Sequence, residues 1–106
     1  MYKPLPDSLT IKTSKVDGLG LFATKGIGQG TNLGMSHVLI GSGIIRTPMG
    51  GFINHSNDAN TVKVELKING TDDPLLKVAT KKWNLVTLRD IKEGEEVTVR
   101  YTFYDV

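Results

Sequence analysis

No stretch of this chain shows helical periodicity over three turns, and this absence constrains the fold more than any other feature of the sequence. Apolar and polar residues instead alternate over short runs, which turn-forming residues separate at intervals of about ten positions. The chain has 12 glycines in 106 residues, which favours turns and backbone-lined surfaces over long helices. We therefore predict a mainly β protein, by pattern alone a small barrel or sandwich. Its length fits a single domain over residues 1–106.

The alternation also predicts where the strands lie. Residues 61–68 alternate most cleanly, and we expect a half-buried strand with one apolar face towards the core. Residues 38–40 and 43–47 form a predicted hairpin, and Pro48 with the following glycines interrupts the pattern. The remaining predicted strands are residues 10–14, 21–24, 75–80, 83–88 and 96–101, and the predicted apolar face of 61–68 is Val62, Val64, Leu66 and Ile68.

Composition excludes several classes of function. The formal net charge is +2 and the basic residues are scattered, so we expect no direct nucleic-acid binding. No window reaches the ~20 apolar residues of a membrane span, and the first residues do not resemble a signal peptide. The chain has no cysteine, which favours an intracellular location and excludes thiolate zinc sites. With only His37 and His55 as histidines, we predict no metal site.

Three segments have compositions that suit chemistry. Residues 18–20, a Gly-x-Gly sequence, either allow backbone to approach a ligand or form a tight hairpin turn. Residues 51–60 are dense in Asn, His and Ser, which either bind a ligand or bond their own backbone in a loop. Residues 94–104 end in aromatics, which form either an edge strand with core side chains or an aromatic pocket that orients an amine.

In this order, the three segments resemble the SET domain of protein lysine methyltransferases. That family has an early Gly-x-Gly before Phe-Ala, then Arg-Phe-Ile-Asn-His-Ser-Cys-x-Pro-Asn, and finally Gly-Glu-Glu-Leu-Thr-x-Asp-Tyr. The counterparts here are residues 18–20 with 22–23, residues 52–56 with Asn60, and residues 94–98 with Tyr101. The resemblance extends from about Leu9 to Tyr104, and minimal forms of this kind are similar to SET proteins encoded by viruses or microbes.

The resemblance implies a fold of small antiparallel sheets with a C-terminal pseudoknot, in which the last segment threads a loop near Asn54 and His55. It also implies the cofactor S-adenosylmethionine and a protein substrate with an accessible lysine. Tyr101 matches the catalytic tyrosine, while Phe103 and Tyr104 are the local candidates to line the substrate channel. The implied cofactor-binding residues are Gly18, Leu19, Gly20, Asn54, His55 and Tyr101.

The chain departs from the family pattern at several positions. Gly51, Asn57 and Ala59 stand where Arg, Cys and Pro are common, and Arg100 replaces an acidic or amide residue. The span 31–48 is short where the family has a helical insert. We expect no segment after Val106 to close the channel, a role that a second subunit of a homodimer could take. These departures keep two alternatives open. One is a non-catalytic SET-like module that still binds the cofactor, and the other is a structural, antifreeze-like protein that binds none.

Overall fold

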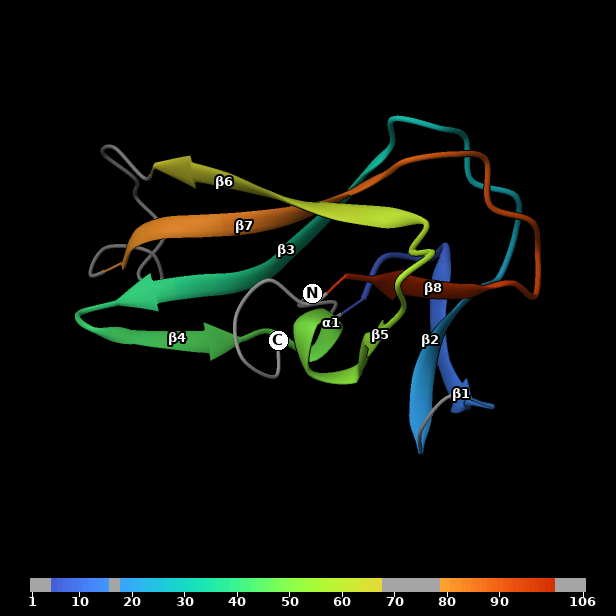
Figure 1. The fold of residues 1–106 in the computed structure, drawn as a ribbon, viewed down its shortest axis with the longest axis horizontal. Helices are drawn as coiled ribbons and strands as arrows, with labels where there is room; N and C mark the ends of the chain where they lie inside the picture. The colour runs from blue at the N-terminus through green and yellow to red at the C-terminus, as the bar shows by residue number, and fades with distance from the viewer. Residues whose placement is uncertain (1–4, 16–17, 68–78, 101–106) are drawn as a thin grey trace.

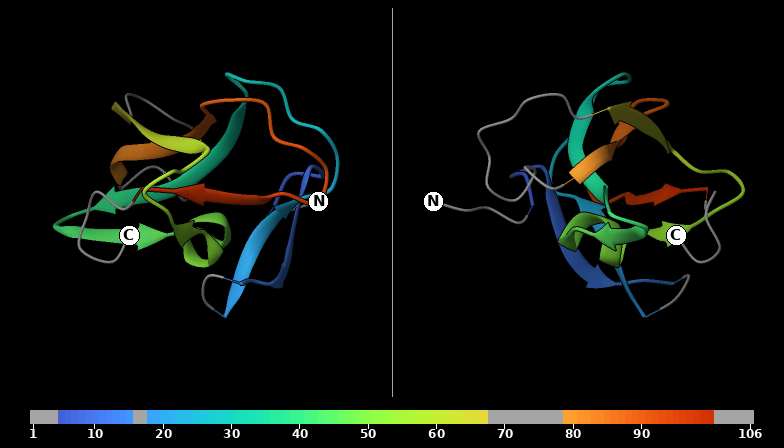
Figure 2. Two further views of the ribbon diagram at one scale, coloured as in Figure 1. Left: turned by 45° about the vertical axis from the view of Figure 1, so that its right-hand side comes forward. Right: turned by 90° about the vertical axis from the view of Figure 1, so that its left-hand side faces the viewer.

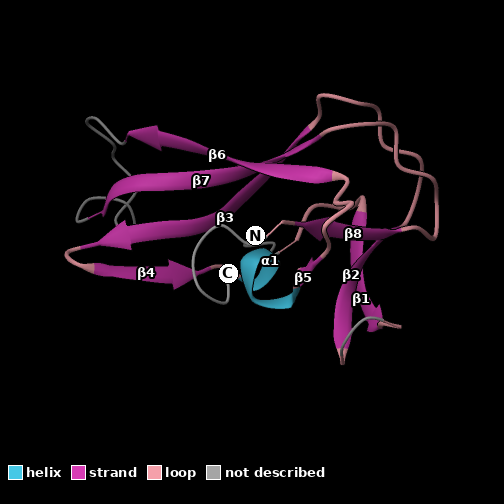
Figure 3. Cartoon of the chain, in the orientation of Figure 1, coloured by secondary structure: helices cyan, strands magenta, loops and turns pink. Residues whose placement is uncertain are grey.

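The computed structural model describes residues 5–15, 18–67 and 79–100, and over these ranges the chain is mostly β (Figures 1 and 3). The prediction of a mainly β chain is therefore confirmed. The one helix within the described ranges is α1 (Pro48–Phe52). The strands are β1 (Leu9–Thr13), β2 (Leu19–Ala23), β3 (Asn32–Ile40), β4 (Gly43–Arg46), β5 (Asn54–His55), β6 (Thr61–Lys67), β7 (Ala79–Thr87) and β8 (Glu96–Val99).

The strands follow the order β1-β2-β8-β6-β7-β3-β4, and β5 also pairs with β8. Most pairs are antiparallel, as predicted, but β8 runs parallel to β5 and to the first residue of β6. The sheet is therefore mixed. The segment that would thread a pseudoknot, residues 101–106, lies outside the described residues.

The strands form two groups at a steep angle to each other, with α1 between them (Figures 1 and 2). The hairpin β1–β2 is one group, and β6, β7, β3 and β4 are the other. The helix contacts β2, β3 and β4, so its buried residue Met49 joins both groups. The core is one cluster of buried apolar side chains: Leu9, Leu21, Ala23, Ile27, Leu33, Met49, Ile53, Leu85, Ile91, Val97 and Val99. No described helix is long and apolar enough to cross a membrane.

The hairpin predicted around residues 41–42 is confirmed as β3 and β4. The predicted break between the strands 75–80 and 83–88 is wrong, because β7 continues through Lys81 and Lys82. Lys81 pairs with β3 on one side and with β6 on the other, and so does Lys82. Backbone pairing on both sides therefore holds these polar residues in the strand. Residues 75–78 lie outside the described residues.

The burial predicted for residues 61–68 is also wrong. Val62, Val64 and Leu66 are 38–40% exposed, whereas Thr61, on the other face, is buried. Lys63, on the same face as Thr61, lies opposite the fully buried Leu85 of β7, so this is the face towards the core. Alternation identifies two faces of a strand but not which of them is covered.

The interruption predicted at Pro48 is in fact the helix α1. Thr47 caps it, because its hydroxyl accepts a hydrogen bond from the Gly50 amide at 3.3 Å, and Pro48 occupies the first turn. The same hydroxyl donates to the Met35 carbonyl at 2.7 Å, which ties the helix to β3. Gly50 packs so closely on β3 that a Cβ there would overlap the carbonyl oxygen of Ser36. Five residues suffice for this helix because side-chain and packing contacts support it.

We expect Gly50→Ala to destabilise the protein by about 3 kcal/mol, because a backbone oxygen cannot move aside as a side chain can. The matched control is Gly51→Ala in the same helix, where a Cβ would meet nothing within 4 Å. That change should be neutral, or stabilising by up to about 1 kcal/mol through helix propensity. Urea denaturation of the three proteins measures both effects, and equal midpoints for the two variants would contradict the close packing of α1 on β3.

His37 of β3 is a buried titratable group beside the same helix, with 1% of its surface exposed. Its Nδ1 lies 2.8 Å from the Ser36 hydroxyl, which itself donates to the Trp83 carbonyl at 3.2 Å. Because this hydroxyl has one proton to donate, the histidine must be the donor in the first bond. Burial, and then the charges of Lys63 and Arg46, lower the pKa of His37 from 6.5 to about 4. The folded protein therefore holds this imidazole neutral.

A lowered histidine pKa makes the protein less stable in mild acid. Above pH 6.5 the imidazole is neutral in both states, and its contribution to stability is fully present. Below pH 6.5 the unfolded chain binds a proton that the folded chain excludes down to about pH 4. The free energy of unfolding should fall by about 2 kcal/mol between pH 7 and pH 5. In His37→Gln most of this loss should disappear, as urea titrations at the two pH values would show. Identical losses in both proteins would mean that other groups cause it.

Candidate functional site

Strand β8 brings the three segments selected from the sequence to one place. On one side it pairs antiparallel with β2, through Leu21 with Val97 and Phe22 with Glu96. On the other side it pairs parallel with β5, through Asn54 with Thr98. The Gly-x-Gly strand and the Asn-His strand therefore flank the strand that leads to Tyr101. Segments separated by more than thirty residues in sequence become direct neighbours.

The Gly-x-Gly segment combines a turn with a close approach. Gly18 has a φ of +44°, where L side chains are rare, and a Cβ there would meet nothing within 4 Å. The adjacent Leu19 is 49% exposed. At Gly20 the opposite holds, because a Cβ would overlap the carboxylate of Glu96 and lie 3.0 Å from the Asn54 amide nitrogen. The first glycine thus leaves open space, and the second admits two polar side chains.

Asn54 is almost fully buried, with 8% of its surface exposed, and its side chain has defined partners. The amide nitrogen donates to the Leu19 carbonyl at 3.2 Å and to Oε2 of Glu96 at 2.9 Å. The carboxylate of Glu96 also accepts from the Ser14 hydroxyl, at 2.8 and 2.9 Å to its two oxygens. Glu96 therefore connects the end of β1, the Gly-x-Gly strand and the Asn-His strand through one side chain.

His55 follows in β5 and is only half-buried. Its Nε2 lies 3.1 Å from the side-chain oxygen of Asn57. Its backbone is held by the pairing with Val99, and the next amide, that of Ser56, donates to the Val99 carbonyl at 3.1 Å. The ring thus sits at the surface on a backbone fixed by β8. This fits a residue that contacts a ligand mainly through main chain.

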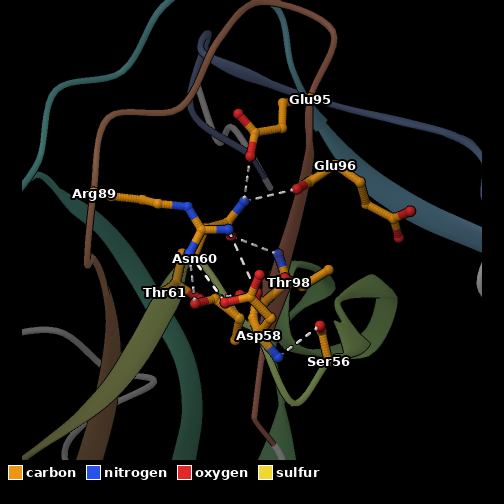
Figure 4. Close-up of polar contacts among 9 residues, drawn as sticks. Ser56, Asp58, Asn60, Thr61, Arg89, Glu95, Glu96 and Thr98 are labelled. Carbon is orange, nitrogen blue, oxygen red and sulfur yellow. Dashed lines mark hydrogen bonds and ion pairs between the residues drawn. The ribbon is translucent and has the colours of Figure 1, made fainter.

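Beyond β5 in the sequence, the side chain of Asn60 forms hydrogen bonds with the backbone of β8 (Figure 4). Its amide oxygen accepts from the backbone N–H of Thr98 at 2.8 Å, and its nitrogen donates to the Glu96 carbonyl at 2.8 Å. The nitrogen also contacts the Glu95 carboxylate at 3.3 Å, and the Thr61 hydroxyl donates to the Thr98 carbonyl at 2.6 Å. These side chains supply the bonds that a neighbouring strand would otherwise make.

The loop between His55 and Asn60 is held from the other side by Arg89. Its guanidinium donates to the carbonyls of Ala59 and Asp58 at 3.2 and 3.4 Å and lies 3.8 Å from the Asp58 carboxylate (Figure 4). The Ser56 hydroxyl accepts from the Asp58 amide at 3.1 Å. The sequence allowed two interpretations of this segment, and one of them, a loop that bonds its own backbone, therefore applies to residues 56–59. The other interpretation, a ligand site, stays a prediction for Asn54 and His55.

Of the residues selected from the sequence, the structure places Leu19 and Gly20 beside Asn54. Gly18 precedes Leu19 in the turn, and His55 follows Asn54 in β5. Three further predictions, Tyr101, Phe103 and Tyr104, lie outside the described residues. Within the ranges that the structure describes, no group of three metal-ligating side chains is present. Sequence reasoning gave no role to Ser14 or Glu96. Glu96 lies inside the third motif, and that position was its only signal.

The family model for the SET domain matches residues 42–102, which is more than half of the 106 residues. The chain belongs to the SET-domain family. The matched region begins at the β3–β4 hairpin and includes the Asn-His strand, β8 and its continuation. The resemblance inferred from the three motifs is therefore confirmed. No curated protein matches this SET-domain chain.

Solved structures show the same fold. A Plasmodium falciparum protein, provisionally named a histone methyltransferase, is similar over 91% of this chain and 98% of its own, with a TM-score of 0.72 and 18% identity. Polycomb Repressive Complex 2 of Chaetomium thermophilum, in a humanized mutant bound to an inhibitor, is similar over 89% of this chain, with a TM-score of 0.67 and 20% identity. This SET-domain chain spans only 15% of that second chain. At such identities the similarity establishes the fold.

Asn60 should be one of the most sensitive positions of this SET domain. We expect Asn60→Ala to destabilise it by about 3 kcal/mol, because the change leaves a buried Thr98 N–H and the Glu96 carbonyl without their partners. Asn57→Ala is the matched control, since Asn57 is exposed and its side chain bonds only the His55 ring among the contacts described. Thermal and urea unfolding of both variants test this, and similar stabilities for the two would contradict it.

Proposed function

We propose that this SET-domain chain is an S-adenosylmethionine-dependent methyltransferase that acts on a lysine side chain of a protein substrate. One observation carries the proposal. Strand β8 lies between the Gly-x-Gly strand and the Asn-His strand, so the family's three motifs meet at one site. Family membership supports methyl transfer, while the cofactor and the lysine are inferred from the resemblance of the motifs.

The residues at this site suit S-adenosylmethionine, whose sulfonium and ammonium groups are positive and whose carboxylate is negative. The polar groups gathered near Gly20 are two acceptors, the Glu96 carboxylate and the Leu19 carbonyl, and one donor, the Asn54 amide nitrogen. The open space at Gly18 leaves backbone accessible to the amino-acid portion. Asn54 and His55 would hold the amino-acid and adenine portions, respectively. When bound, this cofactor supplies an electrophilic methyl group on a positive sulfur.

The chemistry requires a neutral amine. With S-adenosylmethionine bound, a lysine nitrogen would accept the electrophilic methyl group that this cofactor would supply, so the lone pair of that nitrogen must not carry a proton. At pH 7 only about one lysine in a few thousand is neutral in water. A narrow apolar channel next to a positive sulfur would disfavour the ammonium form. The protein then needs positioning and oriented oxygen dipoles rather than a strong base, and the hydroxyl of Tyr101 fits that role.

One observation favours the rival, a binding module that keeps the cofactor without turnover. The span where the family has a helical insert is here only the β3–β4 hairpin, and all four residues of β4 are exposed. A substrate groove with one wall missing would need a second subunit or the substrate itself to complete it. The methyltransferase proposal also includes an intracellular location and a protein partner with an accessible lysine, as expected from the sequence.

We expect the purified protein to transfer labelled methyl groups from S-adenosylmethionine to lysines in a histone mixture or a cell lysate. Tyr101→Phe should lower the rate by at least about tenfold, because it removes one oriented hydroxyl. It should leave cofactor affinity in calorimetry within about twofold, since the main cofactor contacts come from other residues. Cofactor binding with no transfer to any mixture would favour the binding module. Equal rates of transfer for the two proteins would contradict the catalytic role of Tyr101.

A further inference from the structure

Glu96 is the one residue of the third motif whose carboxylate turns towards the other two motifs. Figure 4 shows its backbone carbonyl facing Asn60 while the carboxylate points away from that group. The carboxylate lies against Gly20, between the Asn54 amide and the Ser14 hydroxyl. A side chain with larger bulk than glycine at position 20 would occupy this place. The sequence therefore leaves room for a carboxylate at the centre of the site.

The carboxylate decides which way the Asn54 amide faces. An ionised carboxylate and a peptide carbonyl can only accept hydrogen bonds, and both lie on the same end of this amide, at 2.9 and 3.2 Å from its nitrogen. The reverse orientation would place the amide oxygen against two acceptors and would lose both bonds. Glu96 and Leu19 together therefore direct the nitrogen inward and leave the oxygen on the opposite end. This oxygen has two lone pairs and can accept more than one bond.

We propose that Glu96 is a positioning residue, which orients the Asn54 amide so that its oxygen accepts a hydrogen bond from the cofactor's ammonium group. This inference rests on the proposed function. According to this inference, the Glu96 carboxylate makes the site selective for ligands that carry the amino-acid portion, and it does so through its contact with Asn54. Ser14 supports the same arrangement, because its hydroxyl bridges the two carboxylate oxygens and fixes their plane.

The test is Glu96→Gln, which keeps the shape of the side chain but gives it an N–H₂ group. Such a carboxamide can donate to the Asn54 oxygen, so only the Leu19 carbonyl then opposes the reversed orientation of the Asn54 amide. Three ligands separate the possible effects in calorimetry. S-adenosylmethionine and S-adenosylhomocysteine share the amino-acid portion, and only the first has a sulfonium charge. 5′-Methylthioadenosine has the adenosine and sulfur but no amino-acid portion.

We expect Glu96→Gln to weaken S-adenosylmethionine and S-adenosylhomocysteine by about tenfold each, and 5′-methylthioadenosine by less than about twofold. The matched control, Glu93→Gln, removes the same charge from an exposed residue near β8 and should leave all three affinities unchanged. Ser14→Ala should give a smaller loss with the same selectivity. Melting temperatures of each variant show whether the fold is intact.

Equal weakening of all three ligands would indicate general distortion of the site and would overturn the positioning role. So would unchanged affinities in Glu96→Gln, or a loss confined to S-adenosylmethionine, which would point to the sulfonium charge alone. A parent protein that binds none of the ligands would overturn the proposed function itself and, with it, this role. An NMR measurement checks the orientation without ligand: the Asn54 side-chain N–H₂ should show contacts to Gly20 in the parent, and these should weaken in Glu96→Gln.

Discussion

The structure depends on how the short strand β8 is held on both sides. It has only four residues, Glu96–Val99, and pairs with β2 over just two positions and with β5 over two more. The Asn60 side chain adds bonds to the Glu96 carbonyl and the Thr98 amide that no adjacent strand provides at this point. The Asn60 side chain therefore makes hydrogen bonds that the backbone of a neighbouring strand would otherwise make. Because β8 carries two fully buried residues, Val97 and Val99, the same contacts also fix the core between the two groups of strands.

The location of the site follows from this pairing. Parallel pairing of β5 with β8 places Asn54 opposite Thr98, and antiparallel pairing of β2 places Phe22 opposite Glu96. The side chains of Asn54 in β5 and of Ser14 after β1 then reach the carboxylate of Glu96, provided that no side chain fills the space at Gly20. Glycine at this position is thus explained by a contact within the protein. Glycine at position 18 has a different explanation, since the backbone there adopts a φ of +44°.

The sequence predicted the positions of the strands better than it predicted which face of each strand is buried. Alternation located the β3–β4 hairpin and the strand from Thr61, since side-chain periodicity is a local property. It assigned the wrong face of β6 to the core, because burial depends on what packs against a strand from elsewhere. Thr61 and Lys63 face Leu85 and the core, and the valines opposite them face solvent. The helix α1 was missed for a similar reason: Pro48 and two glycines are poor helix formers, and contacts of Thr47 with β3 stabilise the turn.

The order of the motifs predicted which segments form the site, but it did not predict the hydrogen bonds between their side chains. Matching motifs predicted a common site for Gly18, Gly20, Asn54 and His55; the structure places Gly20 beside Asn54, and their role in binding a ligand stays a prediction. The link between Ser14 and Glu96 spans 82 positions, and no local pattern announces such a contact. The structure shows that the backbone and the side chain of Glu96 bind different partners. The backbone oxygen of Glu96 binds Asn60 and supports β8, whereas its carboxylate binds Asn54 and faces the site. A side-chain substitution at this position removes only the second set of bonds, so the stability of β8 and the geometry of the site can be changed separately.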